Sequence, residues 1–163
     1  RKEVVLRKPG VTIGVPTDEA GHREAVVLFL SKRERDVILL GLPSEKLASV
    51  VGLNSVFEHV QALVYTTREP IDKGVWPVLR VLDVDDSLIE LSHRQDVTGA
   101  WRGDERLEHT GAPESLPFPQ LAVAGEGVVR NVARQLHEGN PSKFTTKVIK
   151  NTARLYGYLQ ARS

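Results

Sequence analysis

The sequence contains no cysteine, so disulfide bonds, thiolate metal sites and a cysteine nucleophile are excluded, although this does not identify the cellular compartment. Its longest apolar run, Ala25 to Leu30, is far too short to span a bilayer, and no contact with a membrane is expected. The first residues show no signal-peptide pattern. We favour a cytoplasmic location.

Motifs that identify known chemistry are absent as well. The sequence has no HExxH zinc pattern, no Walker phosphate-binding loop and no GxSxG nucleophile elbow. The histidines are scattered, and no two of them have the i, i+4 spacing of a zinc-binding helix. We expect no cofactor, and a catalytic function is not favoured.

The composition is that of an ordinary globular domain. Hydrophobic residues make up 40% and charged residues 26% of the 163 positions, which argues against disorder and is consistent with one domain over residues 1–163. Because the chain starts at Arg1 and ends inside a helical pattern, we expect a fragment of a larger protein. The order of apolar segments predicts an α+β fold with a C-terminal two-helix hairpin packed on an antiparallel or mixed sheet.

Two hairpins are expected to build the sheet, with a short central helix between them. The first hairpin pairs Ala25–Leu30, a continuous apolar run typical of a strand buried on both faces, with Asp36–Gly41. The second pairs Val75–Val84 with Ser87–Ser92, and Pro77 indicates an edge strand because proline cannot donate to a neighbour.

The remaining segments of the first two thirds are shorter. Val4–Leu6 and Val11–Val15 are expected as strands around a Pro9-Gly10 turn. A helix is expected from Ser44, a suitable N-cap, to Gly52. Asn54–Thr67 fits either a helix or a strand, and we favour a short helix followed by a strand.

Residues 93–120 are polar and proline-rich, and they are expected to form a long ordered loop or flap anchored by Trp101, Leu107 and Phe118. Residues 126–162 are expected to form the helical hairpin, with Gly139 ending the first helix and Ser142 capping the second. The apolar faces of both helices are expected to cover the sheet. They comprise Val128, Val129, Val132 and Leu136 in the first helix, and Phe144, Val148, Thr152, Leu155 and Leu159 in the second.

A basic stripe on the second helix is the main functional signal. Lys143, Lys147, Lys150 and Arg154 follow at i, i+4, i+7 and i+11, on the side that we expect to lie opposite the apolar face. On the first helix, Arg130 and Arg134 lie outside the apolar stripe. From residue 126 onward, seven Lys and Arg stand against two Glu, a net charge of +5, whereas the rest of the chain carries −4.

The leading hypothesis is a non-catalytic binding module that presents this basic face to a nucleic acid or to an acidic protein. The simpler interpretation is a solvated outer face of a packed helix. An alternative function is that of an interaction or assembly domain of a larger protein. Residues 93–120 would then make the contacts, and a homo-oligomer is one such assembly.

A metal-dependent enzyme is the third hypothesis. Asp83, Asp85 and Asp86 follow an apolar run, as carboxylates that hold Mg²⁺ or Mn²⁺ often do, although aspartates are equally typical of a turn. A pair such as His93 with Asp96 is a further candidate for acid–base chemistry.

Overall fold

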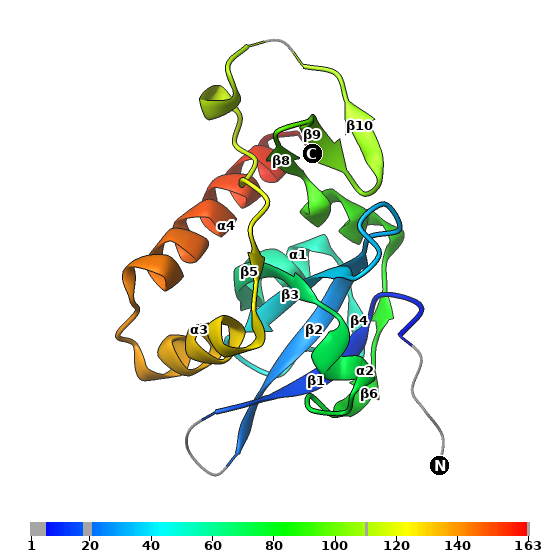
Figure 1. Ribbon diagram of the computed structural model, residues 1–163, viewed down its shortest axis with the longest axis vertical. Coiled ribbons are helices and arrows are strands. Elements are labelled where there is room, and N and C mark those ends of the chain that lie inside the picture. Colours follow the sequence, from blue (N-terminus) through cyan, green and yellow to red (C-terminus); the bar gives the residue numbers. More distant parts are fainter. Residues whose placement is uncertain (1–5, 18–20, 110, 163) are drawn as a thin grey trace.

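The computed structural model describes residues 6–17, 21–109 and 111–162, and it shows an α+β fold around one mixed six-stranded sheet (Figure 1). The strands of this sheet are β1 Val11–Pro16, β2 His22–Leu30, β3 Val37–Pro43, β5 Val60–Thr67, β6 Val78–Val81 and β11 Val123–Ala124. Their spatial order is β11-β5-β3-β2-β1-β6. All neighbours are antiparallel except β11 and β5, which run parallel. The predicted fold class is confirmed.

The other elements are short pieces and two long helices. Two small sheets are formed by β4 Val50–Val51 with β7 Asp83–Val84, and by β8 Arg94–Asp96, β9 Gly99–Arg102 and β10 Glu105–Leu107. The α-helices are α1 Leu53–His59, α2 Glu69–Asp72, α3 Glu126–Glu138 and α4 Lys143–Arg162, and two 3-10 helices are η1 Asp86–Ser92 and η2 Pro113–Ser115. Within the described residues, no helix combines the length and apolar composition needed to cross a membrane.

The first predicted hairpin is confirmed as β2 and β3, and β2 is buried on both faces from Ala25 to Phe29. The Pro9-Gly10 turn precedes β1, and Gly10 has a φ of +106°. A Cβ at this position would lie 2.3 Å from the carbonyl oxygen of Leu82, so the turn requires glycine. Most of the predicted strand Val4–Leu6 lies outside the described residues.

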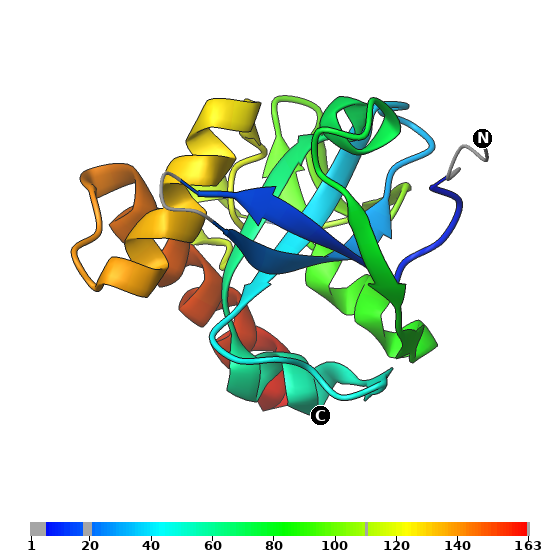
Figure 2. The same ribbon diagram turned by 90° about the horizontal axis from the view of Figure 1, so that it is seen from below.

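Each face of the large sheet has its own cover. Alternate residues of the central strands pack on one side against α3 and the start of α4, through Val129, Val132, Ala133 and Val148. The opposite side packs against α1, η1, the small β8–β10 sheet and the later part of α4. The residues that these elements supply include Val56, Leu88, Leu91, Ala100, Leu155 and Leu159. Helix α4 therefore belongs to both hydrophobic cores. Figure 2 shows α4, coloured orange to red, running from beside α3 at the left to the C-terminus below the strands.

Helix α4 also covers part of an open sheet edge. Strand β11 pairs with β5 only at Tyr65 and Thr66, which leaves the first half of β5 without a neighbouring strand on that side. There the N–H of Leu63 donates to Thr152 Oγ1 at 3.0 Å, and the hydroxyl of Tyr156 donates to the carbonyl oxygen of Val60 at 2.8 Å. Side chains of α4 thus replace a missing strand.

The predicted helix from Ser44 to Gly52 is wrong, because these residues form bends and irregular structure that lead into the two-residue strand β4. The N–H and hydroxyl of Ser44 both donate to the carbonyl oxygen of His59, so Ser44 does not cap a helix. The carbonyl groups of Ser49 and Val51 accept from the N–H groups of Asp83 in β7 and of Asp85 directly after it, and these bonds hold Val50–Val51 as β4. Helix α1 followed by β5 confirms the order favoured for Asn54–Thr67.

The returning strand predicted at Ser87–Ser92 is instead the 3-10 helix η1. Asp85 caps it by accepting a hydrogen bond from the N–H of Ser87, and Leu88 and Leu91 point inward at a spacing of three. The strand before it is shorter than expected, since β6 begins directly after Pro77. Strand β6 lies at the edge of the sheet, as the proline indicated.

Residues 93–120, expected as a loop or flap, contain the three strands β8–β10 and the turn η2. Trp101 and Phe118 are buried and Leu107 packs on the core, so the expected apolar anchors are confirmed. The small sheet is fastened by Asp104, whose carboxylate accepts from Ser31 Oγ and from the N–H groups of Lys32 and Arg33. This segment is thus a packed layer over the large sheet.

Candidate binding groove beside helix α4

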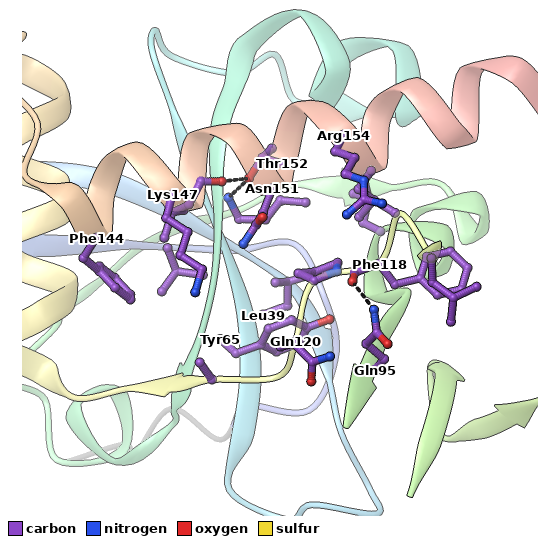
Figure 3. A pocket seen from close by; sticks show the side chains of 18 of the residues that line it. Leu39, Tyr65, Gln95, Phe118, Gln120, Phe144, Lys147, Asn151, Thr152 and Arg154 are labelled. Atoms are coloured by element: carbon purple, nitrogen blue, oxygen red, sulfur yellow. Dashed lines mark hydrogen bonds between the residues drawn. The ribbon is translucent and has the colours of Figure 1, made fainter. Parts of the chain in front are cut away.

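Two adjoining cavities lie along α4. The first, which we call the α4 cavity, has a volume of about 340 Å³ and lies between α4 and residues 113–122 (Figure 3). The second, the α3 cavity, has a volume of about 510 Å³ and lies between β11, α3 and the first turn of α4. Both are lined by Ala122 and Phe144. The two cavities therefore form one groove, which we call the α3–α4 groove.

The α4 cavity has an apolar floor and polar walls. Buried side chains of β3, η1 and α4 form the floor, among them Leu39, Leu91 and Leu155. In Figure 3, Lys147 and Asn151 extend from α4 toward the segment that carries Phe118 and Gln120. The polar residues that line this cavity are Gln95, Glu114, Gln120, Lys147, Asn151, Thr152 and Arg154.

The α3 cavity is lined without a charged side chain among the described residues. Three large apolar side chains at its walls are open to solvent: Val123 is 46%, Val128 40% and Phe144 39% exposed. They come from three different elements, β11, α3 and α4. A cluster of exposed apolar side chains around a concave surface is typical of an interaction site.

The apolar faces predicted for the two helices are largely confirmed, with two exceptions. Val129 and Val132 of α3 are buried, and so are Val148, Leu155 and Leu159 of α4. The exceptions are Val128 and Phe144, which the periodicity assigned to the core and which the structure places at the groove. No local signal separates them from their buried neighbours, because exposure depends on which distant segments pack against each side chain.

The structure divides the six basic residues proposed from the sequence. Lys147 and Arg154 line the α4 cavity, and Arg154 also donates to the carbonyl oxygen of Glu114 at 3.4 Å. Lys143 and Lys150 are exposed on the same helix. The stripe therefore borders part of the apolar face of α4, at Phe144 and Leu155, and does not lie wholly opposite to it.

The two arginines of α3 lie apart from this groove, since neither Arg130 nor Arg134 is among its lining residues. Arg134 bonds Glu138 and the side chain of Asn131 within its own helix. Of the six proposed residues, the structure places Lys147 and Arg154 in the lining of the groove.

A hydrogen-bonded turn fixes Phe144 and Lys147 relative to α3. Gly139 ends α3 in the left-handed conformation with a φ of 73°, and Ser142 Oγ accepts from the N–H of Thr145 at 3.3 Å, so both predicted caps are confirmed. Gln135 Oε1 accepts from the N–H of Ser142 at 2.8 Å and from the hydroxyl of Thr145 at 2.7 Å. These hydrogen bonds hold the first turn of α4 against the last turn of α3.

The tyrosines of α4 are occupied inside the fold. Tyr156 is 8% exposed and hydrogen-bonded to β5, and burial raises the pKa of its hydroxyl well above the ordinary value. The ring of Tyr158 contacts the rings of His93 and Phe118 edge-on, with centroids 5.7 and 5.1 Å away. Stacking on nucleic-acid bases would require these rings to leave those contacts.

His93 supports the wall of the α4 cavity and makes the stability depend on pH. His93 is 2% exposed, and its ring packs against the ring of Phe118. Its Nδ1 lies 2.6 Å from the carbonyl oxygen of Glu90. The charges of Arg102 and Arg162 also act on the ring. Loss of hydration on burial, assisted by these two cations, lowers the pKa of His93 below its ordinary value of 6.5, although Glu90 opposes the shift. The neutral ring is therefore the form that the fold accommodates.

We expect the melting temperature to fall as the pH decreases below about 6.5, because the unfolded chain then binds a proton that the folded His93 binds more weakly. Melting curves between pH 7.5 and 5.5, recorded for the wild type and for His93→Asn, measure this dependence. The variant retains an amide near the position of Nδ1 and should show a shallower decrease. Equal slopes for both proteins would contradict this role of His93.

The other candidate chemical groups are not brought together. Asp83, Asp85 and Asp86 are all exposed, and the N–H of Ser87 lowers the pKa of the capping Asp85 carboxyl by donating to it at 2.8 Å. In the described part of the chain, no three His, Asp or Glu side chains lie close enough to share a metal ion. His93 bonds a main-chain oxygen, while the carboxylate of Asp96 accepts from Thr98. An enzymatic role for these residues stays a prediction.

Comparisons of the chain with protein-family models, with curated proteins and with solved structures found no match. The groove is therefore the feature of this protein from which a function can be inferred. Its distinguishing property is that three exposed apolar side chains surround it and that one of them, Phe144, adjoins the exposed Lys143 and Lys147 on α4.

Proposed function

We propose that this protein is a non-catalytic binding module that docks an acidic segment of a partner protein in the α3–α4 groove. The observation that supports this most directly is the exposure of Phe144 and Val128 beside the lysines of α4. Apolar side chains of a partner would fill the α3 cavity, and neighbouring carboxylates would face Lys143, Lys147 and Lys150. Such a mixed surface is typical of protein interfaces, which combine an apolar centre with a polar rim.

An acidic protein is favoured over a nucleic acid for two reasons. Nucleic-acid sites of this kind depend on phosphate contacts and on free aromatic rings, whereas Tyr156 and Tyr158 are occupied in the fold. In addition, the α3 cavity has no charged side chain in its described lining to bind phosphates, whereas its apolar walls can bind aliphatic side chains. The basic stripe then sets orientation and association rate more than affinity.

A fluorescein-labelled peptide of Glu and Leu residues tests the proposal by fluorescence polarisation. We expect binding that weakens with added salt, and a loss of about tenfold in affinity for Lys143→Glu with Lys150→Glu, equivalent to about 1.4 kcal/mol. These two residues are chosen because neither lines the α4 cavity. The matched control is Lys32→Glu with Lys46→Glu, two exposed lysines away from the groove, which changes the net charge equally.

Three comparison ligands complete the experiment. A peptide with Ser in place of Leu should bind more weakly, because it leaves the α3 cavity unfilled, and a peptide with Lys in place of Glu should not bind. A mixed-sequence single-stranded RNA should bind no better than the Ser peptide. Tight RNA binding without peptide binding would contradict the proposal and support the nucleic-acid alternative. An equal loss of peptide affinity in both double variants would show that only the net charge of the protein matters.

A further inference from the structure

The α4 cavity is a preformed site of the size that holds a small molecule. Its volume of about 340 Å³ falls within the range of small-ligand sites, about 300–1,000 Å³. The floor consists of side chains that belong to the buried core, such as Leu39, Leu91 and Leu155. On the opposite wall, the side-chain amide of Gln95 donates to the carbonyl oxygen of Phe118 at 2.8 Å. Because both walls are held by the fold, the cavity does not have to be formed by its ligand.

Three polar side chains of α4 stand at one wall of this apolar space. Asn151 lies one helical turn after Lys147 and one turn before Arg154, so an anion at the Asn151 amide has a cation on either side. Thr152 lines the same cavity, but its hydroxyl is committed to the N–H of Leu63 and to the carbonyl oxygen of Val148. Lys147, Asn151 and Arg154 are therefore the groups of α4 that a ligand would meet.

The charges around the cavity favour a single negative charge. Two cations, Lys147 and Arg154, and one anion, Glu114, line it, which gives the described lining residues a net charge of +1. One carboxylate neutralises this charge, whereas a dianion would leave one charge uncompensated in a partly enclosed apolar site. An uncharged ligand would leave the net positive charge of the lining residues uncompensated.

We propose that the α4 cavity binds a small amphipathic monocarboxylate, with its aliphatic chain on the Leu39, Leu91 and Leu155 floor and its carboxylate at Asn151 between Lys147 and Arg154. This site adjoins the surface proposed for a protein segment and shares Lys147 and Phe144 with it, so the two proposals are tested at residues that they do not share. Asn151 and Arg154 line only the α4 cavity, whereas Val128 and Gln135 line only the α3 cavity.

Decanoate and decan-1-ol, a pair that differs only in the carboxylate, test the proposal by isothermal titration calorimetry below the micellar concentration of decanoate. We expect decanoate to bind at least tenfold more tightly than the alcohol. Arg154→Gln should bring decanoate close to the affinity of the alcohol, because one of the two flanking cations is lost. Arg134→Gln, the same change on α3 outside the groove, should leave the affinity for decanoate unchanged.

Blocking the cavity gives the second arm of the experiment. Asn151→Trp from α4 and the exposed Gln120→Trp from the opposite wall should each abolish decanoate binding, and either variant suffices provided that its circular dichroism and melting curve show a folded protein. Equal affinity for decanoate and decan-1-ol would overturn the carboxylate assignment. Undetectable binding, or binding that survives both tryptophan substitutions, would overturn the site. The peptide proposal is tested independently of these results, through the Lys143→Glu with Lys150→Glu variant.

Discussion

Replacing Thr152 by Val and Tyr156 by Phe together is expected to lower the free energy of unfolding by about 2 to 3 kcal/mol. Both substitutions preserve side-chain shape, and each removes one hydroxyl. The first leaves the N–H of Leu63 without its acceptor, and the second leaves the carbonyl oxygen of Val60 without the donor from α4. Thr152 and Tyr156 are 3% and 8% exposed, so water replaces the lost bonds poorly.

Urea unfolding at neutral pH measures this effect. Tyr158→Phe serves as the matched control, because it lies on the same helix and its ring contacts His93 and Phe118. Among the described residues its hydroxyl has no hydrogen-bond partner, so we expect a change of less than about 0.5 kcal/mol. A double variant as stable as this control would show that α4 does not stabilise the edge of β5 through these two bonds.

Glu34→Gln is expected to destabilise the protein by about 2 to 3 kcal/mol, because it leaves a buried guanidinium without its carboxylate. The side chain of Arg94 is 1% exposed and lies 3.4 Å from Glu34 Oε2. The expected loss is smaller than the cost of breaking a fully buried pair, about 3 to 5 kcal/mol. Glu34 keeps 23% of its exposure, and the charge of Asp104 also acts on Arg94.

Two further variants isolate the buried charge as the cause. Glu69→Gln removes the ion pair with Lys73, in which the side chains of Glu69 and Lys73 are 65% and 67% exposed. This change should lower the free energy of unfolding by less than about 0.5 kcal/mol. Arg94→Met combined with Glu34→Gln removes both charges and should regain most of the stability. If the combined variant is as unstable as Glu34→Gln, the loss does not come from an unpaired charge.

These two sets of contacts bear on the proposed binding because they hold the two walls of the groove. Thr152 and Tyr156 fix α4 on β5, while Arg94 is followed by Gln95, whose main chain accepts from Leu121 and donates to Pro119. Variants at these positions would reduce binding by loosening the groove. Binding experiments therefore use the exposed positions Lys143, Lys150 and Arg154, where we expect a charge change to have little effect on folding.

The helical hairpin was the part of the chain most open to prediction. Its caps at Gly139 and Ser142 and the spacing of Val129, Val132 and Val148 act within one or two turns, so local chemistry decides them. The same local logic failed at Ser44, where the hydroxyl bonds the distant His59 in place of a helix N-terminus. At Ser87–Ser92, the spacing of Leu88 and Leu91 is consistent with η1, whereas we predicted the returning strand of a hairpin there.

Only part of the candidate site could be predicted from the sequence. The basic stripe was evident from the spacing of Lys143 to Arg154, because four cations at helical intervals occupy one side of any helix. The groove beside it was not, since Phe144 and Val128 have the same periodicity as residues that are buried. Ala122 and Phe118, which build the other wall, are separated from α4 by more than twenty residues and carry no motif.

The sequence by itself determined the class of fold, the continuous buried strand β2, the Pro9-Gly10 turn and the two C-terminal helices with their basic side. These features follow from backbone preferences and apolar spacing over a few residues. Only the tertiary structure decided that α4 covers the edge of β5, that residues 93–120 form a sheet, and that Phe144 lies open beside Lys147. Each of these depends on which distant segment covers a given side chain, and spacing along the chain does not encode that.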